Sequence, residues 1–250
     1  MAQTLEGFIA VQAALEARSR PIHAVWVRED KRDADALRIA RLAAAGGVPV
    51  ERVRADALAG QVSGDSHGGI IALVGERHLL TLADLVQAVS AAADVPFVIM
   101  LDGVEDPFNF GQAVRAFYAA GAHGLVVRPR SWMSAAGVVG RASAGASERI
   151  PTAQAESAEA AAEVFRAAGL RVAIADSQRA ISLYDADLRI PLFLLVGGER
   201  RGVTRSFASK ADLRLKIPYG RPFEHDLGTT AAAAVLAFEI LRQRGTKNPP

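Results

Sequence analysis

The chain has 250 residues and is half hydrophobic by composition, enough to bury a large core as one domain or two smaller ones. It contains no cysteine, which excludes disulfides, thiolate nucleophiles and zinc sites built from cysteine. The formal net charge is only +2, so the sequence pI of about 9.2 is a weak indication of nucleic-acid binding.

Arginine dominates the cationic residues, because only four of the 29 are lysine. Two explanations stay open: the base composition of the genome, and phosphate recognition by arginine side chains. Residues 1–16 lack a cationic segment, and no apolar run reaches the ~18 residues that a membrane helix needs. We therefore expect a cytoplasmic protein without a membrane-spanning segment.

The N-terminal third alternates between helical and strand-like patterns. They predict helices at 5–17, 33–45 and 55–59, and strands at 22–27, 48–53 and 70–74. Ser66 to Gly69 form a polar turn before the last of these strands. We expect residues 1–75 to be a compact α/β domain, followed over 76–95 by a linker and a helix that Thr81 caps.

The clearest pattern runs from Phe97 to Val127. An apolar run at 97–101 predicts a strand buried on both faces, and the spacing over 110–120 predicts a helix that Gly121 ends. A second strand follows at 125–127, which completes a βαβ unit. The loop at 102–109 is polar and rich in turn formers, and it lies where open α/β sheets bind ligands.

The remainder predicts a partly helical segment at 134–146, a helix at 158–168, strands at 171–175, 191–196 and 213–217, and a long helix at 227–244. Two further polar loops follow apolar strands, at 197–202 and 218–228. In the first, GGERRG, the glycines allow a ligand to approach the backbone closely. The glycine patterns of dinucleotide-binding and P-loop enzymes do not match, which argues against those classes.

The three loops resemble the three motifs of the SpoU (TrmH-like) branch of the SPOUT knotted RNA methyltransferases. Residues 101–121 read LDGVEDPFNFGQAVRAFYAAG and are similar to the first motif, roughly LDxVxDPxNxGxxxRxAxxxG, with Phe117 where the family prefers alanine. GGERRG is similar to the second motif, and Ile217 and Pro218 open the third. GFIAVQAAL and HGGIIA resemble segments of the family's N-terminal substrate-binding domain.

The resemblance implies an α/β fold: a SPOUT domain over 96–250 with a parallel sheet and a deep trefoil knot, plus a small N-terminal RNA-binding domain. It also implies a homodimer. The implied activity is methyl transfer from S-adenosylmethionine to a ribose 2′-hydroxyl, with ribosomal RNA favoured over transfer RNA because of the separate N-terminal domain.

Carried over by motif position, the resemblance places Gly197, Ile217 and Leu227 in the cofactor cradle, and Asn109, Arg115 and Glu199 at the reaction site. A helical side chain leans toward the N-terminus of its helix, so Arg115 would point toward the loop that holds Asn109. There it would bind a phosphate and stabilise a developing alkoxide. An arginine rarely loses its proton, which argues against a general base.

The third motif departs most from the family. Members usually read SLNVS where residues 226–230 read DLGTT, so a serine and an asparagine are missing. Three explanations stay open: Glu224, His225 or Asp226 supplies a substitute, the target differs, or catalysis is weakened or lost. The alternative function is therefore a knotted RNA-binding homologue without efficient chemistry.

Simpler roles compete with the functional ones. Asn109 or Asp226 would serve as a helix cap, and Glu199 would pair with a neighbouring arginine at the surface. His67 is better explained as a turn residue than as an RNA contact.

Overall fold

The computed structural model describes residues 3–62, 67–129, 135–176, 180–198 and 202–245. Its contacts divide the chain into two compact units. Unit 1 comprises Met1–His78 and Trp132–Arg149, and unit 2 comprises Leu79–Ser131 and Ile150–Pro250. The predicted domain boundaries at 75 and 95 stay predictions.

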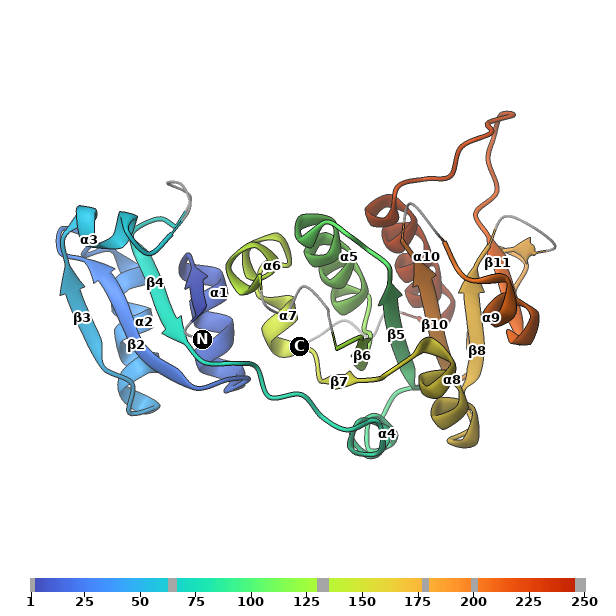
Figure 1. Cartoon of the computed structure of the whole chain (residues 1–250), viewed down its shortest axis with the longest axis horizontal. Coiled ribbons are helices and arrows are strands. Elements are labelled where there is room, and N and C mark those ends of the chain that lie inside the picture. The colour runs from blue at the N-terminus through green and yellow to red at the C-terminus, as the bar shows by residue number, and fades with distance from the viewer. Residues whose placement is uncertain (1–2, 63–66, 130–134, 177–179, 199–201, 246–250) are drawn as a thin grey trace. The chain divides into compact units, whose positions relative to one another are not determined.

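Unit 1 is built on a four-stranded sheet in the order β1-β4-β2-β3 (Figure 1). Strand β4 is antiparallel to both neighbours, whereas β2 and β3 are parallel. The elements of the unit are β1 (Gln3–Glu6), α1 (Phe8–Ala17), β2 (Ile22–Arg28), α2 (Ala34–Ala45), β3 (Val50–Val53), α3 (Ala55–Ala59), β4 (Ile70–Val74), α6 (Ala136–Ala142) and α7 (Ala146–Arg149). Buried apolar side chains of α1, α2, β2 and β4 form its core.

The helix predicted at 5–17 is wrong in its first residues. Residues 3–6 form β1, which pairs with β4 so that Leu5 lies opposite Ala72. Gly7 separates the strand from α1 with a φ of 86°, a conformation that favours glycine. Such a short strand is stabilised by a partner far along the chain, so the local sequence does not predict it.

Helices α6 and α7 pack in unit 1 through small residues. A Cβ on Gly145 would lie 2.6 Å from the Cβ of Ala13, and one on Gly137 would lie 3.0 Å from the carbonyl oxygen of Thr4. Gly145 also has a φ of 78°. The glycines of this segment therefore allow a close approach to β1 and α1.

Unit 2 contains a seven-stranded sheet in the order β7-β6-β5-β10-β8-β11-β9, in which every pair is parallel. Its elements are α4 (Leu82–Ser90), β5 (Phe97–Asp102), α5 (Pro107–Ala119), β6 (Gly124–Val127), β7 (Thr152–Gln154), α8 (Ala158–Ala167), β8 (Arg171–Ala175), β9 (Ile181–Ser182), β10 (Leu192–Gly197), α9 (Arg205–Lys210), β11 (Leu213–Lys216) and α10 (Thr229–Arg244). The predicted α/β class and parallel sheet are confirmed. The trefoil knot stays a prediction.

Two layers of helices cover this sheet, because alternate strand residues face opposite sides. On one side Phe193 of β10 stacks on Phe165 of α8 at 4.9 Å, in a core that also includes α4 and α9. On the other side Phe97 of β5 meets Phe117 of α5 edge-on at 6.0 Å, and α10 packs beside α5. The central strands are consequently buried on both faces.

Arg244 fixes the end of α10 to the amino edge of the sheet. Its guanidinium donates hydrogen bonds to the carbonyl oxygens of Val95 at 2.7 Å, Ile190 at 2.7 Å and Leu188 at 3.0 Å. It also lies over the ring of Phe97 at 5.3 Å. Burial lowers the pKa of Arg244 to about 10.

Several other predictions differ from the structure in detail. Helix α5 starts at Pro107 rather than at residue 110, because Asp106 caps it and Pro107 suits the first helical position. Strands β7 and β9 and helix α9 were not predicted, since each is very short. Among the described residues, no helix is long and apolar enough to span a bilayer.

Candidate active site

Two of the three polar loops start side by side at the carboxyl edge of the unit 2 sheet. Strands β5 and β10 are neighbours, and Gly197 lies opposite Asp102 in their register. The backbone nitrogen of Gly198 donates a hydrogen bond of 2.7 Å to the carbonyl oxygen of Asp102. The first and second motifs are therefore joined through their backbones.

Glycine is required where these loops meet. A Cβ on Gly198 would lie 1.8 Å from the carbonyl oxygen of Gly103, and one on Gly197 would lie 2.4 Å from the carbonyl carbon of Gly202. Gly202 in turn donates a backbone hydrogen bond of 2.9 Å to Gly198. Gly198 and Gly202, at the two ends of the loop, are therefore joined by their backbones, and only glycine fits at its base.

Asn109 lies half-buried in the first turn of α5, where Asp106 is the helix cap. The carboxylate of Asp106 accepts hydrogen bonds from the backbone nitrogens of Phe108 at 3.1 Å and Asn109 at 3.3 Å. The alternative in which Asn109 itself caps the helix is therefore wrong. Its side chain is directed to other partners.

One of those partners is Thr230 in the first turn of α10. Its hydroxyl donates to the Oδ1 of Asn109 at 3.5 Å, across 121 residues of chain. Residues 226–230 lack the family's serine and asparagine, and no role was predicted for this hydroxyl from the sequence. The structure brings it to the predicted reaction site.

Charged groups flank the carboxyl ends of β5 and β6. Arg128, directly after β6, lies 3.6 Å from the carboxylate of Asp102 and was not among the residues predicted from the sequence. Arg115 is exposed on α5, almost two turns beyond Asn109. Both arginine side chains are exposed to solvent, and the guanidinium of Arg128 faces the carboxylate of Asp102.

The third loop begins at the same edge of the sheet but two strands away, because β8 lies between β10 and β11. Ile217 is half-buried directly after β11, whereas Leu227 and all other residues of 218–228 are exposed. The backbone nitrogen of Leu227 donates to the hydroxyl of Tyr219 at 3.1 Å, which joins the two arms of the loop. Figure 1 shows the loop projecting away from the strands.

The remaining predicted positions have mixed outcomes. Glu199 lies outside the described residues, so its place in the site stays a prediction. Asp226 does not cap α10, because Gly228 occupies the cap position without a side-chain hydrogen bond. Glu224 and His225 are exposed in the third loop.

His67 is a turn residue, since its Nδ1 accepts a 3.0 Å hydrogen bond from the nitrogen of Gly69.

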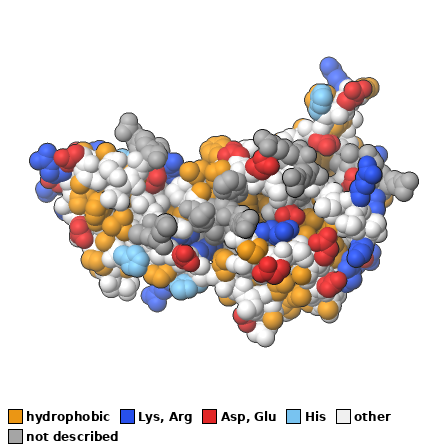
Figure 2. All heavy atoms as spheres, viewed as in Figure 1, with side chains coloured by type: hydrophobic (Ala, Val, Ile, Leu, Met, Phe, Trp, Pro, Cys, Tyr) orange, Lys and Arg blue, Asp and Glu red, His pale blue; other side chains and the backbone are white. Residues whose placement is uncertain are grey.

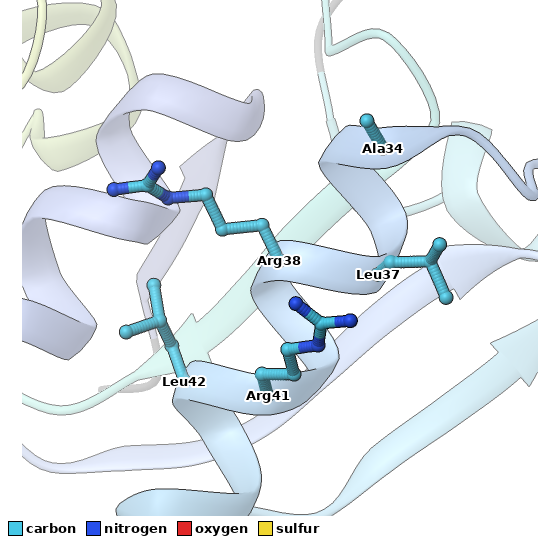
Figure 3. Close-up of a pocket in the computed structure, with 5 residues that line it drawn as sticks. All are labelled: Ala34, Leu37, Arg38, Arg41 and Leu42. Carbon is cyan, nitrogen blue, oxygen red and sulfur yellow. The ribbon is translucent and has the colours of Figure 1, made fainter.

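A separate pocket of about 460 Å³ lies on α2 of unit 1. It is lined by Ala34, Leu37, Arg38, Arg41 and Leu42 (Figure 3). Figure 3 shows its two guanidinium groups on the helix surface. Within the part of the chain that the structure describes, no cluster of three or more histidine, cysteine or acidic side chains is arranged to hold a metal ion.

Comparisons with known proteins cover almost the whole chain. Residues 96–237 match the SpoU rRNA methylase family, and residues 4–79 match the RNA 2′-O ribose methyltransferase substrate-binding family. The chain is 31% identical to the 23S rRNA (guanosine-2′-O-)-methyltransferase RlmB of Yersinia pestis, over 99% of this chain and 100% of that protein. It is 29% identical to the RlmB protein of Shewanella oneidensis, over 95% and 96% of the two chains.

Solved structures show the same fold. The S-adenosylmethionine-bound rRNA methyltransferase of Sinorhizobium meliloti superposes with a TM-score of 0.80 at 23% identity, covering 98% of this chain and 88% of that one. The SpoU methyltransferase AviRb of Streptomyces viridochromogenes, also in complex with the cofactor, gives 0.77 at 22% identity and covers 96% and 90%.

Proposed function

Because the chain belongs to the SpoU rRNA methylase family, we propose that the carboxyl edge of the unit 2 sheet carries its reaction centre. The chain is an S-adenosylmethionine-dependent RNA methyltransferase that acts on a ribose 2′-hydroxyl of ribosomal RNA. The observation that supports this centre is the pairing of Gly197 with Asp102, which joins the second motif to the first. The contact between Asn109 and Thr230 adds a link from the first motif to the start of α10.

The residues present fit the cofactor. When bound, S-adenosylmethionine supplies a methyl group on a positively charged sulfur. Gly197 and Gly198 let the second motif pack backbone against backbone on Gly103 and Gly202, so main-chain amide and carbonyl groups rather than side chains form the base of the proposed cradle. Ile217 and Leu227 add apolar contacts from the third loop. We assign Gly197, Ile217 and Leu227 to the cofactor cradle.

We assign Asn109, Arg115 and Glu199 to the side of the site that receives RNA. The exposed Arg115 guanidinium binds a phosphate beside the target ribose and stabilises negative charge on the attacking oxygen. Thr230 holds the amide of Asn109 in place. Most of the rate enhancement then comes from positioning, because methyl transfer requires an in-line geometry.

The names of the relatives make a guanosine of 23S rRNA the first target to test. Unit 1, which includes the match to the substrate-binding family, would recognise the RNA around it. A ribosomal RNA substrate also supports a cytoplasmic location. We further propose a homodimer, because Phe108, Tyr118 and Phe238 of α5 and α10 leave apolar surface exposed.

The test is transfer of labelled methyl groups from S-adenosylmethionine to ribosomal RNA that lacks the modification. A 2′-O-methyl group blocks alkaline cleavage of the adjacent phosphodiester, which maps the product. We expect Asn109→Ala and Arg115→Ala to lower kcat/KM about 100-fold, and Arg189→Ala, an exposed arginine outside the motifs, to leave it unchanged.

Full activity in Arg115→Ala would contradict its role. RNA binding without any methyl transfer by the wild-type chain would instead support the alternative, a knotted RNA-binding homologue. The altered third motif, with Gly228 where the family carries asparagine, keeps that alternative in the test.

A further inference from the structure

The loop at 218–228 exposes aromatic rings to solvent. Phe223 is 59% exposed and Tyr219 is 40% exposed, in a segment where every residue is exposed. Figure 1 shows the loop leaving β11 and returning to α10 as a projection, and Figure 2 shows hydrophobic, histidine and charged side chains gathered on it. Exposed rings on such a loop are unfavourable in water, which suggests a binding role.

These rings contact one another without stacking face to face. Tyr219 and Phe223 meet at 6.0 Å with an interplanar angle of 64°, and Phe223 and His225 meet at 5.5 Å with an angle of 77°. Each ring has two faces, and each edge-to-face contact covers only one face of one ring. The cluster therefore keeps open ring faces for a flat ligand.

Charge argues for a base rather than a phosphate as that ligand. Besides His225, the loop carries one cation, Arg221, and two carboxylates, Glu224 and Asp226. Phosphate binding requires an excess of cations, so this loop is poorly suited to the RNA backbone. Stacking does not require a positive surface, because every base presents a π-face.

The loop is also attached to the reaction centre. The hydrogen bond from Leu227 to Tyr219 closes its base, and Thr230, which follows closely, contacts Asn109. Thr230 thus joins the segment that carries the rings to Asn109, the residue proposed to lie at the target ribose. Sequence-specific RNA recognition commonly uses unpaired bases that stack on aromatic side chains.

We propose that Tyr219, Phe223 and His225 form a stacking platform for an unpaired base next to the methylated nucleotide. The proposal rests on the proposed function, since it takes the RNA from that reaction. It assigns a substrate contact to the segment in which the chain departs from the family's third motif. The adenine of the cofactor and a second copy of the chain are the competing occupants.

The test measures binding of a mixed-sequence, single-stranded RNA oligonucleotide that contains the fluorescent base 2-aminopurine. Stacking on an aromatic ring changes the emission of this base, so affinity and stacking are read together. We compare the wild-type chain with Phe223→Leu, which keeps apolar volume without a ring, and Phe223→Trp, which keeps a ring. Tyr184→Leu is the matched control, because Tyr184 is 54% exposed outside the loop.

We expect Phe223→Leu to weaken RNA binding about 5- to 100-fold and to remove the change in emission, while Phe223→Trp retains both. Tyr184→Leu should behave as the wild type. Calorimetry should give the same S-adenosylmethionine affinity for Phe223→Leu and wild type, and sedimentation the same oligomeric state.

Unchanged RNA binding in Phe223→Leu, or no binding by the wild-type chain, would overturn the platform. A loss of cofactor affinity without a loss of RNA affinity would assign the loop to the cofactor, and a change of oligomeric state alone would assign it to a second copy. Methylation of ribosomal RNA by the wild-type chain is scored separately, so failure of the proposed function is recognised independently.

Discussion

Arg20 and Glu148 form a buried ion pair in unit 1, although 128 residues of chain separate them. The Nη2 of Arg20 lies 2.9 Å from Oε1 of Glu148 and its Nε lies 3.0 Å from Oε2, with both side chains 1% exposed. Gln3 accepts a further hydrogen bond from Arg20 at 3.0 Å, and Ser19 donates one to Glu148. The pair thus ties α7 to the N-terminal segment.

Removal of the charge on Glu148 should destabilise unit 1 strongly. In Glu148→Gln the buried Arg20 loses its counter-ion, and Arg77, whose pKa burial already lowers to about 10, loses the charge that opposes this lowering. Breaking a buried pair costs about 3 to 5 kcal/mol of unfolding free energy. Urea unfolding followed by the fluorescence of Trp26 on β2, in a Trp132→Phe background, measures it.

Two further variants test whether the unpaired buried charge causes the loss of stability in Glu148→Gln. The double variant Arg20→Met with Glu148→Leu should recover part of the loss, because apolar residues can replace a buried pair. Arg54→Gln removes one side of an exposed pair in the same unit and should have no measurable effect. A loss for Arg54→Gln as large as for Glu148→Gln would contradict this explanation.

Gly198→Ala should disrupt the base of the GGERRG loop. Its Cβ would lie 1.8 Å from the carbonyl oxygen of Gly103, so the joined backbones of the first and second motifs must separate. We expect S-adenosylmethionine affinity to fall at least 10-fold, measured by calorimetry on protein shown to be folded by circular dichroism. Gly60→Ala is the matched control, because Gly60 lies outside the three motifs, its φ is −69°, and a Cβ there has no neighbour closer than 3.6 Å.

The sequence predicted the elements correctly where the local pattern of apolar and polar residues matches their burial in the fold. The apolar run at 97–101 lies on a central strand whose faces are both covered, and the polar residues after it follow directly from the end of that strand. Strands β1 and β7 escaped detection because their stability comes from partners elsewhere in the chain, such as the 2.9 Å hydrogen bond from Leu80 to Thr152 of β7.

The sequence predicted which three loops form the site, but not which residues contact one another there. The sequence around Arg128 and Thr230 does not predict a role for either residue in the site. Each is brought there by a contact with another element, Arg128 with Asp102 and Thr230 with Asn109. The start of α5 was misplaced for a different reason: Asp106 and Pro107 suit both a turn and a helix N-terminus. Only the hydrogen bonds to Asp106 decide between them.

His123 should make the stability of unit 2 depend on pH. Burial lowers its pKa below the usual 6.5, the positive charge of Arg244 acts in the same direction, and Asp94 opposes them. Its Nδ1 accepts a 3.2 Å hydrogen bond from the backbone nitrogen of Phe97, which requires the neutral ring. The unfolded state therefore binds the proton more readily, so stability falls as pH drops below about 6.5.

The comparison with His123→Asn isolates this contribution, because an asparagine oxygen can accept the same hydrogen bond without titrating. The free energies of unfolding of the two chains should differ by a constant amount above about pH 7.5. Below about pH 6.5 the wild-type chain should lose stability relative to the variant until the folded-state pKa is passed. A difference that stays flat over this range would exclude His123 as the cause.

Thr230 should act on the reaction through Asn109. Thr230→Val keeps the shape of the side chain but removes the hydroxyl that donates to Oδ1 of Asn109 at 3.5 Å. A hydrogen bond of this kind is worth about 0.5 to 1.5 kcal/mol, so kcat should fall about 2- to 10-fold. Cofactor affinity should stay unchanged, because Thr230 does not belong to the proposed cradle. Thr230→Ser keeps the hydroxyl and should retain the rate. Equal losses in the two variants would show that the methyl group of Thr230, rather than its hydroxyl, supports Asn109.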